Sequence, residues 1–335
     1  MPSLERESNR IVIAGASSLL GAELKALLEE GRFAASDFRL VDEEIAAGTL
    51  TEAGGEPAVI QPVEEGSFER ARFVFFTGSA EFTRRNLAEA TRASATVLDL
   101  SGGIAGDAKT VVWFPKLDAL LGREFKKNAG AYAIPSAAGM AAAALALALA
   151  KNGLRRLVMT FFQPASEAGR RGIEELESQT GELLSFQGVG EPLFDTQVAF
   201  NMVDRFGPAS AQKLGAIRER VRLEAKACLG KKMAIPAIHV VHAPVFYGTA
   251  FAAWAELKES ANAENISNAC QEAGFAMAKN GDVGPSNVSA AGEKIIQLAK
   301  PEADDSQPGT WWFWGAADNI RLPAANAVRL AEMLA

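Results

Sequence analysis

A turn that contains glycines is the first part of the sequence with recognisable binding chemistry. Residues 15–21 read Gly-Ala-Ser-Ser-Leu-Leu-Gly and join an apolar run to a helical pattern. Such a turn directs backbone N–H groups at a helix start toward a pyrophosphate. Ser18 replaces the middle glycine, so we keep two interpretations, a nucleotide-binding turn and a turn retained as scaffold. The candidate cofactor contacts are Gly15, Ser17, Ser18, Leu19 and Gly21.

A group of carboxylates follows the next apolar run, at Asp42, Glu43 and Glu44. In a dinucleotide fold the end of the second strand reads the adenosine ribose, and carboxylates there accept hydrogen bonds from a 2′-hydroxyl and repel a 2′-phosphate. If a dinucleotide binds, NAD is favoured over NADP, with Asp42 as a further candidate contact. A solvated acidic loop without a ligand is the alternative interpretation.

Other groups that could catalyse a reaction are scarce. The chain has two histidines, His239 and His242, three residues apart in a predicted strand. Because side chains alternate between the faces of a strand, the two histidines should face opposite ways and share no metal ion. Cys228 falls in a helical pattern and is interpreted as a packing residue. The sequence therefore predicts no metal site.

The elements that must position these residues change character along the chain. The first third predicts a helix at 19–30 among buried strands, and this alternation is typical of a parallel sheet. These strands are expected at 11–13, 38–41, 73–76 and 97–100. From Leu157 onward longer strands and polar helices indicate an α+β second domain. There we expect strands at 157–162, within 235–257 and at 311–314, helices at 167–186, 211–229, 263–279 and 324–334, and a surface loop at 301–309.

Length and composition exclude several classes of protein. The 335 residues suggest two domains, and the net charge of −7 offers no clustered cations for nucleic acid. The apolar stretch 137–150 is too short for a membrane span and predicts a buried helix. Two cysteines and an N-terminus without signal-peptide features point to the cytoplasm. The expected partners are a second copy of the chain and a small-molecule ligand, not nucleic acid or membrane.

Several segments resemble, in order and spacing, the motifs of the aspartate-semialdehyde dehydrogenase family. The most specific are Gly-Ile-Glu-Glu-Leu-Glu-Ser-Gln-Thr at 172–180 and the closing segment, in which Asp-Asn-Ile-Arg at 318–321 precedes Ala-Ala-Asn-Ala-Val at 324–328. Further matches are the glycine turn and residues 97–101, 163–166, 199–201 and 243–248. The resemblance spans nearly the whole chain.

This resemblance implies a fold and a set of further contacts. It implies a Rossmann-type parallel-sheet NAD(P)-binding domain, residues 1–130 with the C-terminal helix 318–335, and an α+β dimerisation domain, residues 131–317. It implies a homodimer and kinship with enzymes of amino-acid biosynthesis. It also implies that Ser166, Gly169 and Asn319 contact the cofactor, with Asn319 near the nicotinamide.

The residues that the family uses for chemistry are missing. The resemblance implies a reaction in which a cysteine at a helix N-terminus forms a thioester that phosphate releases, but Ala137 stands at the cysteine position. Thr249 replaces the histidine base, and His242 and Ala105 replace arginines that hold substrate and phosphate. Gln163 remains. Ser136 is the nearest hydroxyl, and since it lacks an evident base we interpret it as a helix N-cap.

Two functions therefore compete, and no catalytic residue is assigned. The first is a non-catalytic structural or regulatory homologue. The alternative is an NAD(P)-dependent oxidoreductase for a different aldehyde or acyl substrate, with a remodelled pocket. That pocket would contain Ser136, Gln163, His242 and Thr249. A small-molecule sensor is a third interpretation.

Overall fold

The computed structural model describes residues 9–335 except 47, 54, 232, 280 and 282. Contacts divide the chain into two compact units: unit 1 comprises residues 1–113, 125–134 and 323–335, and unit 2 comprises residues 114–124 and 135–322. The predicted limits placed 114–124 in the first domain, whereas contacts group them with unit 2. Residues 1–8, from which we expected a cytoplasmic protein without a leader, lie outside the described part. Within that part, no helix combines the length and apolarity that a bilayer crossing needs.

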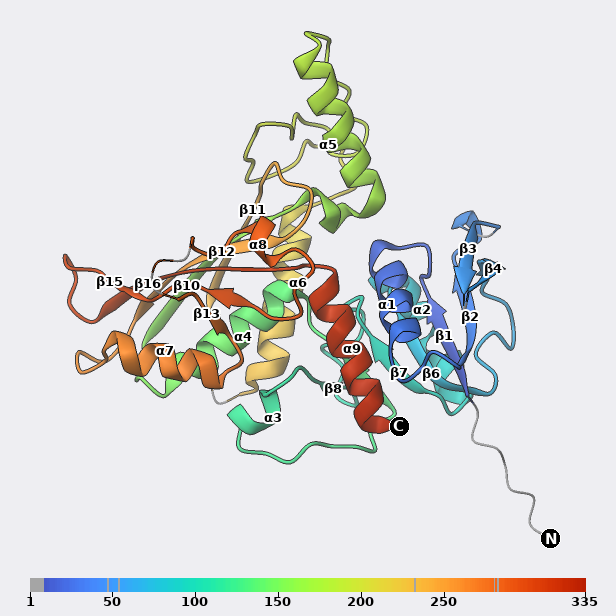
Figure 1. Ribbon diagram of the computed structural model, residues 1–335, viewed down its shortest axis with the longest axis horizontal. Helices are drawn as coiled ribbons and strands as arrows, with labels where there is room; N and C mark the ends of the chain where they lie inside the picture. The colour runs from blue at the N-terminus through green and yellow to red at the C-terminus, as the bar shows by residue number, and fades with distance from the viewer. Residues whose placement is uncertain (1–8, 47, 54, 232, 280, 282) are drawn as a thin grey trace. The chain divides into compact units, whose positions relative to one another are not determined.

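Unit 1 contains a seven-stranded parallel sheet in the order β5-β2-β1-β6-β7-β9-β8, as the first third of the sequence predicts (Figure 1). A short hairpin, β3–β4, lies outside this sheet. The strands are β1 (Arg10–Ala14), β2 (Asp37–Asp42), β3 (Leu50–Ala53), β4 (Glu56–Val59), β5 (Gln61–Pro62), β6 (Ala71–Phe76), β7 (Thr96–Asp99), β8 (Val111–Val112) and β9 (Ala131–Ala133). The helices are α1 (Leu19–Glu30), α2 (Ala80–Arg92) and most of α9 (Arg321–Leu334).

Apolar runs explain why these strands are central. The side chains from Ile11 to Ala14 and from Phe73 to Phe76 are buried on both faces of the sheet, as a parallel sheet covered by helices requires. Ser18 caps α1 and Ser79 caps α2 by accepting backbone N–H bonds. The carboxyl ends of β1, β2 and β6 therefore meet where the glycine turn begins α1.

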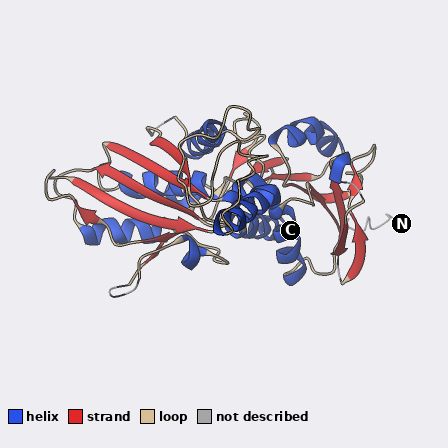
Figure 2. Cartoon of the chain, turned by 90° about the horizontal axis from the view of Figure 1, so that it is seen from above, coloured by secondary structure: helices blue, strands red, loops and turns tan. Residues whose placement is uncertain are grey.

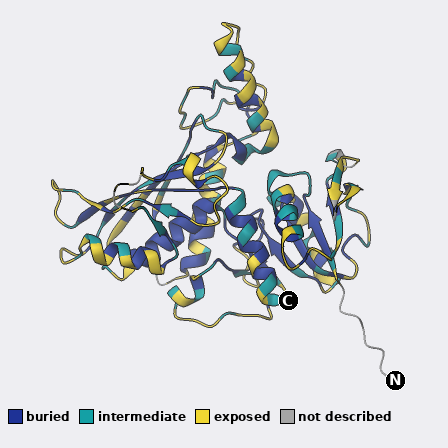
Figure 3. Cartoon of the chain, viewed as in Figure 1, coloured by how far each residue is buried: buried dark blue, intermediate teal, exposed yellow. Residues whose placement is uncertain are grey.

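Unit 2 is built on a mixed sheet in the order β11-β10-β12-β16-β14-β13, with β15 beside β16. Its long strands are drawn in red in Figure 2. Helices α4, α6 and α7 cover one face, and α4 is buried along nearly its whole length, as its alanine-rich sequence predicts (Figure 3). The strands are β10 (Arg156–Gln163), β11 (Ala237–His242), β12 (Thr249–Glu256), β13 (Ala276–Met277), β14 (Gln297–Leu298), β15 (Glu302–Ala303) and β16 (Thr310–Ala317). The helices are α3 (Leu117–Leu120), α4 (Ala137–Ala150), α5 (Gly169–Leu184), α6 (Leu214–Leu229), α7 (Ala263–Glu272) and α8 (Asn287–Ala290).

Two sequence predictions for unit 2 are wrong in detail. Helix α7 ends at Glu272 instead of reaching residue 279, because Gly274 adopts a φ of +100° and the chain turns into β13. The expected loop 301–309 contains the short strand β15, which pairs with β16. The long apolar stretch 235–257 divides into β11 and β12.

Helix α5 carries the motif at 172–180, and two of its side chains hold the loop that follows. Glu175 is buried and accepts the backbone N–H groups of Leu193 (2.5 Å) and Phe194 (3.1 Å). Gln179 is fully buried and accepts the N–H groups of Val198 (2.7 Å) and Ala199 (3.1 Å). These polar residues of the motif therefore make structural contacts, and we call the pair the α5 clamp.

Candidate functional site

The glycine turn of unit 1 is tight and internally hydrogen-bonded. Gly15 has a φ of +96°, and a Cβ there would collide with the backbone at Gly78, so only glycine fits. The Ser18 hydroxyl donates to the carbonyl of Thr77 (3.0 Å) and accepts the N–H of Gly21 (2.9 Å). In this conformation the hydroxyl is a helix cap engaged inside the protein. Leu19, the last candidate contact of the turn, begins α1.

Asp42 connects the end of β2 to this turn. One carboxylate oxygen accepts the N–H of Ser17 (2.8 Å), the other accepts the N–H of Glu43 (2.8 Å), and the side chain is buried. Glu44 is exposed, and Glu43 forms an ion pair with Arg85 (2.6 Å). The three acidic residues that look equivalent in sequence therefore have different environments, and Asp42 alone is tied to the candidate turn.

A cleft of about 720 Å³ opens beside this carboxylate within unit 1. Its walls combine the acidic end of β2 with apolar and amide side chains from β5 and α2. The lining residues are Asp42, Glu43, Glu44, Pro62, Val63, Glu64, Phe82, Arg85 and Asn86. A cleft of this size with mixed polar and apolar walls can hold a small molecule.

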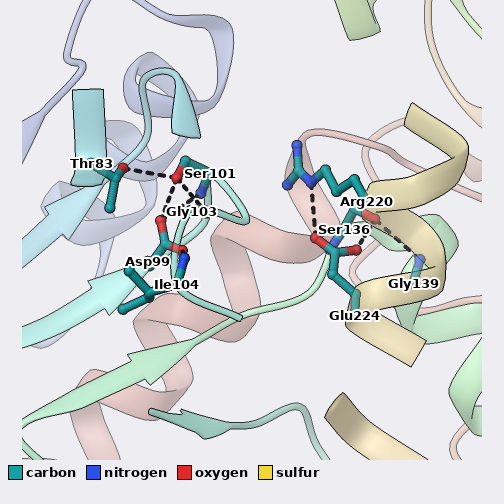
Figure 4. Close-up of polar contacts among 9 residues, drawn as sticks. All are labelled: Thr83, Asp99, Ser101, Gly103, Ile104, Ser136, Gly139, Arg220 and Glu224. Carbon is teal, nitrogen blue, oxygen red and sulfur yellow. Dashed lines mark hydrogen bonds and ion pairs between the residues drawn. The ribbon is translucent and has the colours of Figure 1, made fainter. Parts of the chain in front are cut away.

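The loop after β7 leads to Ala105, the position at which the family resemblance implies an arginine. Asp99 accepts the N–H (3.0 Å) and hydroxyl (2.6 Å) of Ser101, and its other oxygen accepts the N–H of Ile104 (3.1 Å). The Ser101 hydroxyl also meets Thr83 (Figure 4). Ala105 follows this loop and is buried. The loop is therefore well formed, although the methyl side chain of Ala105 cannot bind an anion.

In unit 2 three of the predicted site residues lie together at one end of neighbouring strands. Strands β10 and β11 end there and β12 begins there, which aligns Gln163, His242 and Thr249. All three side chains are buried, and the Thr249 hydroxyl donates to Gln163 Oε1 (2.9 Å). We call these three the polar row. Thr249 is occupied as a hydrogen-bond donor, and a hydroxyl there cannot serve as a general base at neutral pH.

His242 is the unusual member of the polar row. It is 1% exposed and lies against the rings of Phe194 and Phe206, at 5.5 Å from each. Its Nε2 atom has no hydrogen-bond partner among the described residues. Burial lowers the pKa of His242 to about 4, so the imidazole is neutral at pH 7. His239 is exposed on the other face of β11, as strand alternation predicts.

Replacing His242 should change how stability depends on pH. In the unfolded chain the histidine has its ordinary pKa of 6.5, whereas in the folded protein it takes up a proton only near pH 4. Because the unfolded state binds the proton more readily, the wild type loses stability as the pH falls through this range. Between about pH 7.5 and about pH 5 the wild type should lose about 2 kcal/mol more unfolding free energy than His242→Phe does. Urea unfolding at both pH values measures the difference. Parallel losses in the two proteins would contradict a buried neutral imidazole.

Asn319 and Ser166 form a side-chain hydrogen bond with each other. Asn319 follows β16, donates to the Ser166 hydroxyl (3.0 Å) and accepts the N–H of Gly248 (3.0 Å). Gly169, with a φ of +73°, begins α5 directly after the 3-10 turn η2 (Ala165–Ala168). Burial raises the pKa of the neighbouring Glu167, and the Arg220 guanidinium opposes that rise.

The N-terminus of α4 shows what has replaced the expected cysteine. Ala137 is 2% exposed, and Ser136 is the N-cap, accepting the N–H of Gly139 (3.1 Å), as predicted. The Ser136 hydroxyl also donates to Glu224 Oε2 (2.5 Å), and Arg220 holds the other carboxylate oxygen, Oε1 (Figure 4). No hydrogen bond among the described residues joins Ser136 to the polar row.

Glu224 is the principal site residue that the sequence analysis missed. It lies on α6, is fully buried, and accepts both the N–H (3.0 Å) and the hydroxyl of Ser136. The only local signal is its i,i+4 pairing with Arg220. Such a pair is common on exposed helices, so it did not indicate a contact with a residue 88 positions away.

The two cysteines do not supply the missing thiolate. Cys228 on α6 and Cys270 on α7 are both buried. Burial raises the pKa of both thiols, that of Cys270 to about 12. The packing role predicted for Cys228 agrees with this environment. Among the described residues, no group of three or more His, Cys, Asp or Glu side chains could hold a metal ion.

Comparison with known proteins places this geometry in a family. Residues 145–322 match the model "Semialdehyde dehydrogenase, dimerisation domain", and residues 10–120 match "Semialdehyde dehydrogenase, NAD binding domain". The chain is 27% identical to a USG-1 protein homolog of Pseudomonas aeruginosa and 25% identical to aspartate-semialdehyde dehydrogenase 2 of Vibrio cholerae, over 97% of each chain. A solved structure of a probable aspartate-semialdehyde dehydrogenase from Pseudomonas aeruginosa superposes with a TM-score of 0.85 at 27% identity, covering 97% of this chain and 98% of that one.

Proposed function

This chain belongs to the semialdehyde dehydrogenase family, and we propose that it is a member without the family's thioester chemistry that acts as a nucleotide-binding structural or regulatory homodimer. The observation that carries the proposal is Ala137 at the buried N-terminus of α4. A methyl group cannot attack an aldehyde, and loss of a catalytic nucleophile costs about six orders of magnitude in rate.

Three other positions support the same conclusion. Thr249 takes the place of the base and already donates to Gln163, while Ala105 offers no charge for phosphate. His242 is neutral at pH 7 and lacks the bidentate charged fork by which an arginine grips a carboxylate. The proposal therefore rests on several independent losses in a well-formed fold. It is tested by nucleotide binding without semialdehyde turnover.

We expect NAD to bind more tightly than NADP. The proposed position of the adenosine ribose is the cleft beside Asp42, where Glu43 and Glu44 would meet a 2′-phosphate with like charge. Titration calorimetry should show at least about tenfold weaker binding of NADP, since an added charge clash costs at least about 1.4 kcal/mol.

A double variant tests this assignment. Glu43→Gln with Glu44→Gln should bring the NADP affinity close to that of NAD, because the repelling charges are removed. Glu30→Gln, an exposed position at the far end of α1, should preserve the preference. Equal affinities in the wild type would mean that the acidic residues point away from the ribose. If neither nucleotide binds, we would attribute the failure to Ser18 and Asp42, whose side chains already form hydrogen bonds within the protein.

We expect a homodimer through unit 2. The sheet face opposite the helices is apolar and only half-covered, with Val158 43% exposed, Trp312 48% and Trp314 39%. A second copy would bury this face. Sedimentation at micromolar concentration should give twice the 35.4 kDa chain mass. Val158→Glu should shift the protein toward monomer, whereas Leu50→Glu, an exposed position in unit 1, should not. A wild-type monomer would contradict the proposal.

The alternative, an NAD(P)-dependent oxidoreductase with another substrate, is favoured by one observation. The partner-free Nε2 of His242 gives the polar row a buried atom that can hydrogen-bond a substrate. A substrate-dependent change in nicotinamide absorbance, lost in His242→Phe, would select this function over the structural one.

A further inference from the structure

Three side chains at the N-terminus of α4 have the arrangement of an activated nucleophile. The hydroxyl of Ser136 lies 2.5 Å from Glu224 Oε2, and Arg220 Nε lies 2.9 Å from Glu224 Oε1. We propose that Ser136 is a nucleophile, with Glu224 as its general base, that cleaves small carboxylic esters. This activity goes beyond the proposed function, because it needs neither a thiol nor a nucleotide.

The burial of each group fits its part in this reaction. Ser136 is partly exposed, whereas Glu224 is fully buried. Arg220 has a side chain 33% exposed and holds Glu224 by a hydrogen bond, which fixes the carboxylate toward Ser136. The nucleophile, its base and the group that orients the base are therefore joined in one chain of hydrogen bonds.

A glycine makes this contact sterically feasible. Gly139 lies in the first turn of α4, and a Cβ there would collide with the carboxylate of Glu224. Any larger residue at 139 would push Glu224 away from Ser136. The same residue donates its N–H to the Ser136 hydroxyl oxygen (3.1 Å), which limits the rotation of that hydroxyl.

The start of α4 also supplies donors for a developing oxyanion. The N–H groups of Ala137 and Ala138 in the first turn have no acceptor among the described residues. They follow Ser136 directly, and the partial positive charge of a 14-residue helix adds to them. An oxygen that becomes negative after attack by Ser136 would be stabilised there.

The reaction is balanced without an oxidant or a further reactant except water. Ser136 Oγ attacks the ester carbonyl carbon while its proton passes to Glu224 Oε2. The tetrahedral intermediate collapses, the C–O bond to the alcohol breaks, and the alkoxide takes the proton from Glu224. Water then attacks the acyl-serine, giving its proton to the same carboxylate, and the acid leaves as Ser136 recovers its proton.

The test uses the full-length protein with p-nitrophenyl acetate, without nucleotide or phosphate. Ser136→Asn retains an N-cap oxygen but has no hydroxyl, so it should fold and lose at least about 100-fold in the rate of hydrolysis. Glu224→Gln should lose a similar factor. Ser178→Ala is the matched control, because the exposed Ser178 also donates to a glutamate, Glu182 (3.0 Å), and it should keep the full rate.

A covalent label gives a second readout that is independent of turnover. A fluorophosphonate should modify Ser136 of the wild type, as mapped by mass spectrometry, and should not react in Glu224→Gln. Arg220→Gln should slow hydrolysis, because it removes the hydrogen bond that orients Glu224, and Arg220→Lys should restore part of the rate. Equal hydrolysis by wild type and Ser136→Asn, absence of hydrolysis in the wild type, or labelling only at other residues would overturn the inference.

Discussion

Ala137→Cys should leave phosphate-dependent oxidation of aspartate semialdehyde undetectable, although it restores the residue type that the family uses as nucleophile. The new thiol would lie at the N-terminus of α4, which favours a thiolate, but beside the buried carboxylate of Glu224, which opposes one. The family resemblance implies that turnover also requires a base at 249 and anion-binding groups at 242 and 105. Catalytic groups act as a unit, so one restored member recovers little of about six orders of magnitude.

The control is the triple variant Ala137→Cys, Thr249→His, His242→Arg, measured by nicotinamide absorbance. Activity that appears only in the triple variant would show that the fold kept its shape after losing its chemistry. Alkylation of the single variant by iodoacetamide verifies that its thiol is reachable. Robust, phosphate-dependent turnover by Ala137→Cys alone would contradict our account, because it would mean that the other positions retain their function.

Glu175→Ala should destabilise unit 2 by about 3 kcal/mol, since it removes a buried carboxylate that accepts two backbone N–H groups and leaves those groups unsatisfied. Urea unfolding measures the change, and amide exchange at Leu193 and Phe194 should accelerate in step. Glu177→Ala, an exposed position on the same helix, should change stability by less than about 0.5 kcal/mol. Equal stability of the two variants would mean that the α5 clamp does not hold the loop.

The α5 clamp explains why the strongest sequence resemblance says little about chemistry. The polar residues of the motif at 172–180 include Glu175 and Gln179, whose side chains hold backbone groups of residues 193–199. Their exchange would leave buried polar groups without partners, so selection for folding alone can preserve them. The residues that decide the chemistry, such as Ala137, lie outside this motif.

Local patterns predicted most of the fold. Buried β-branched and aromatic runs located β1, β2, β6 and β7, and the helical pattern at 19–30 located α1. The end of α7 was missed because helical periodicity continues past Gly274, where the backbone turns. Strand β15 was missed because two residues carry no recognisable period, and it exists only through pairing with β16.

The candidate site was less predictable, because its contacts join distant parts of the sequence. The sequence placed Ser136 at the start of a helix and named its capping role, but no local pattern brings Glu224 to it across 88 residues. In the same way, Asp42 was singled out for a ribose, whereas its contact with the N–H of Ser17 depends on how β2 ends against the glycine turn. Residue type pointed to the chemistry that we propose is missing, and tertiary contacts were needed to show the partners of the residues at those positions.

The most direct test of the central claim is the assay of the wild-type protein with aspartate semialdehyde, phosphate and either NAD or NADP, at high enzyme concentration. Aspartate-semialdehyde dehydrogenase 2 of Vibrio cholerae, a relative 25% identical in sequence, serves as the positive control. Our account predicts no reduction of either nucleotide above the rate without protein, under conditions in which NAD binding is shown by calorimetry. Phosphate-dependent reduction at a rate near that of the control would contradict it.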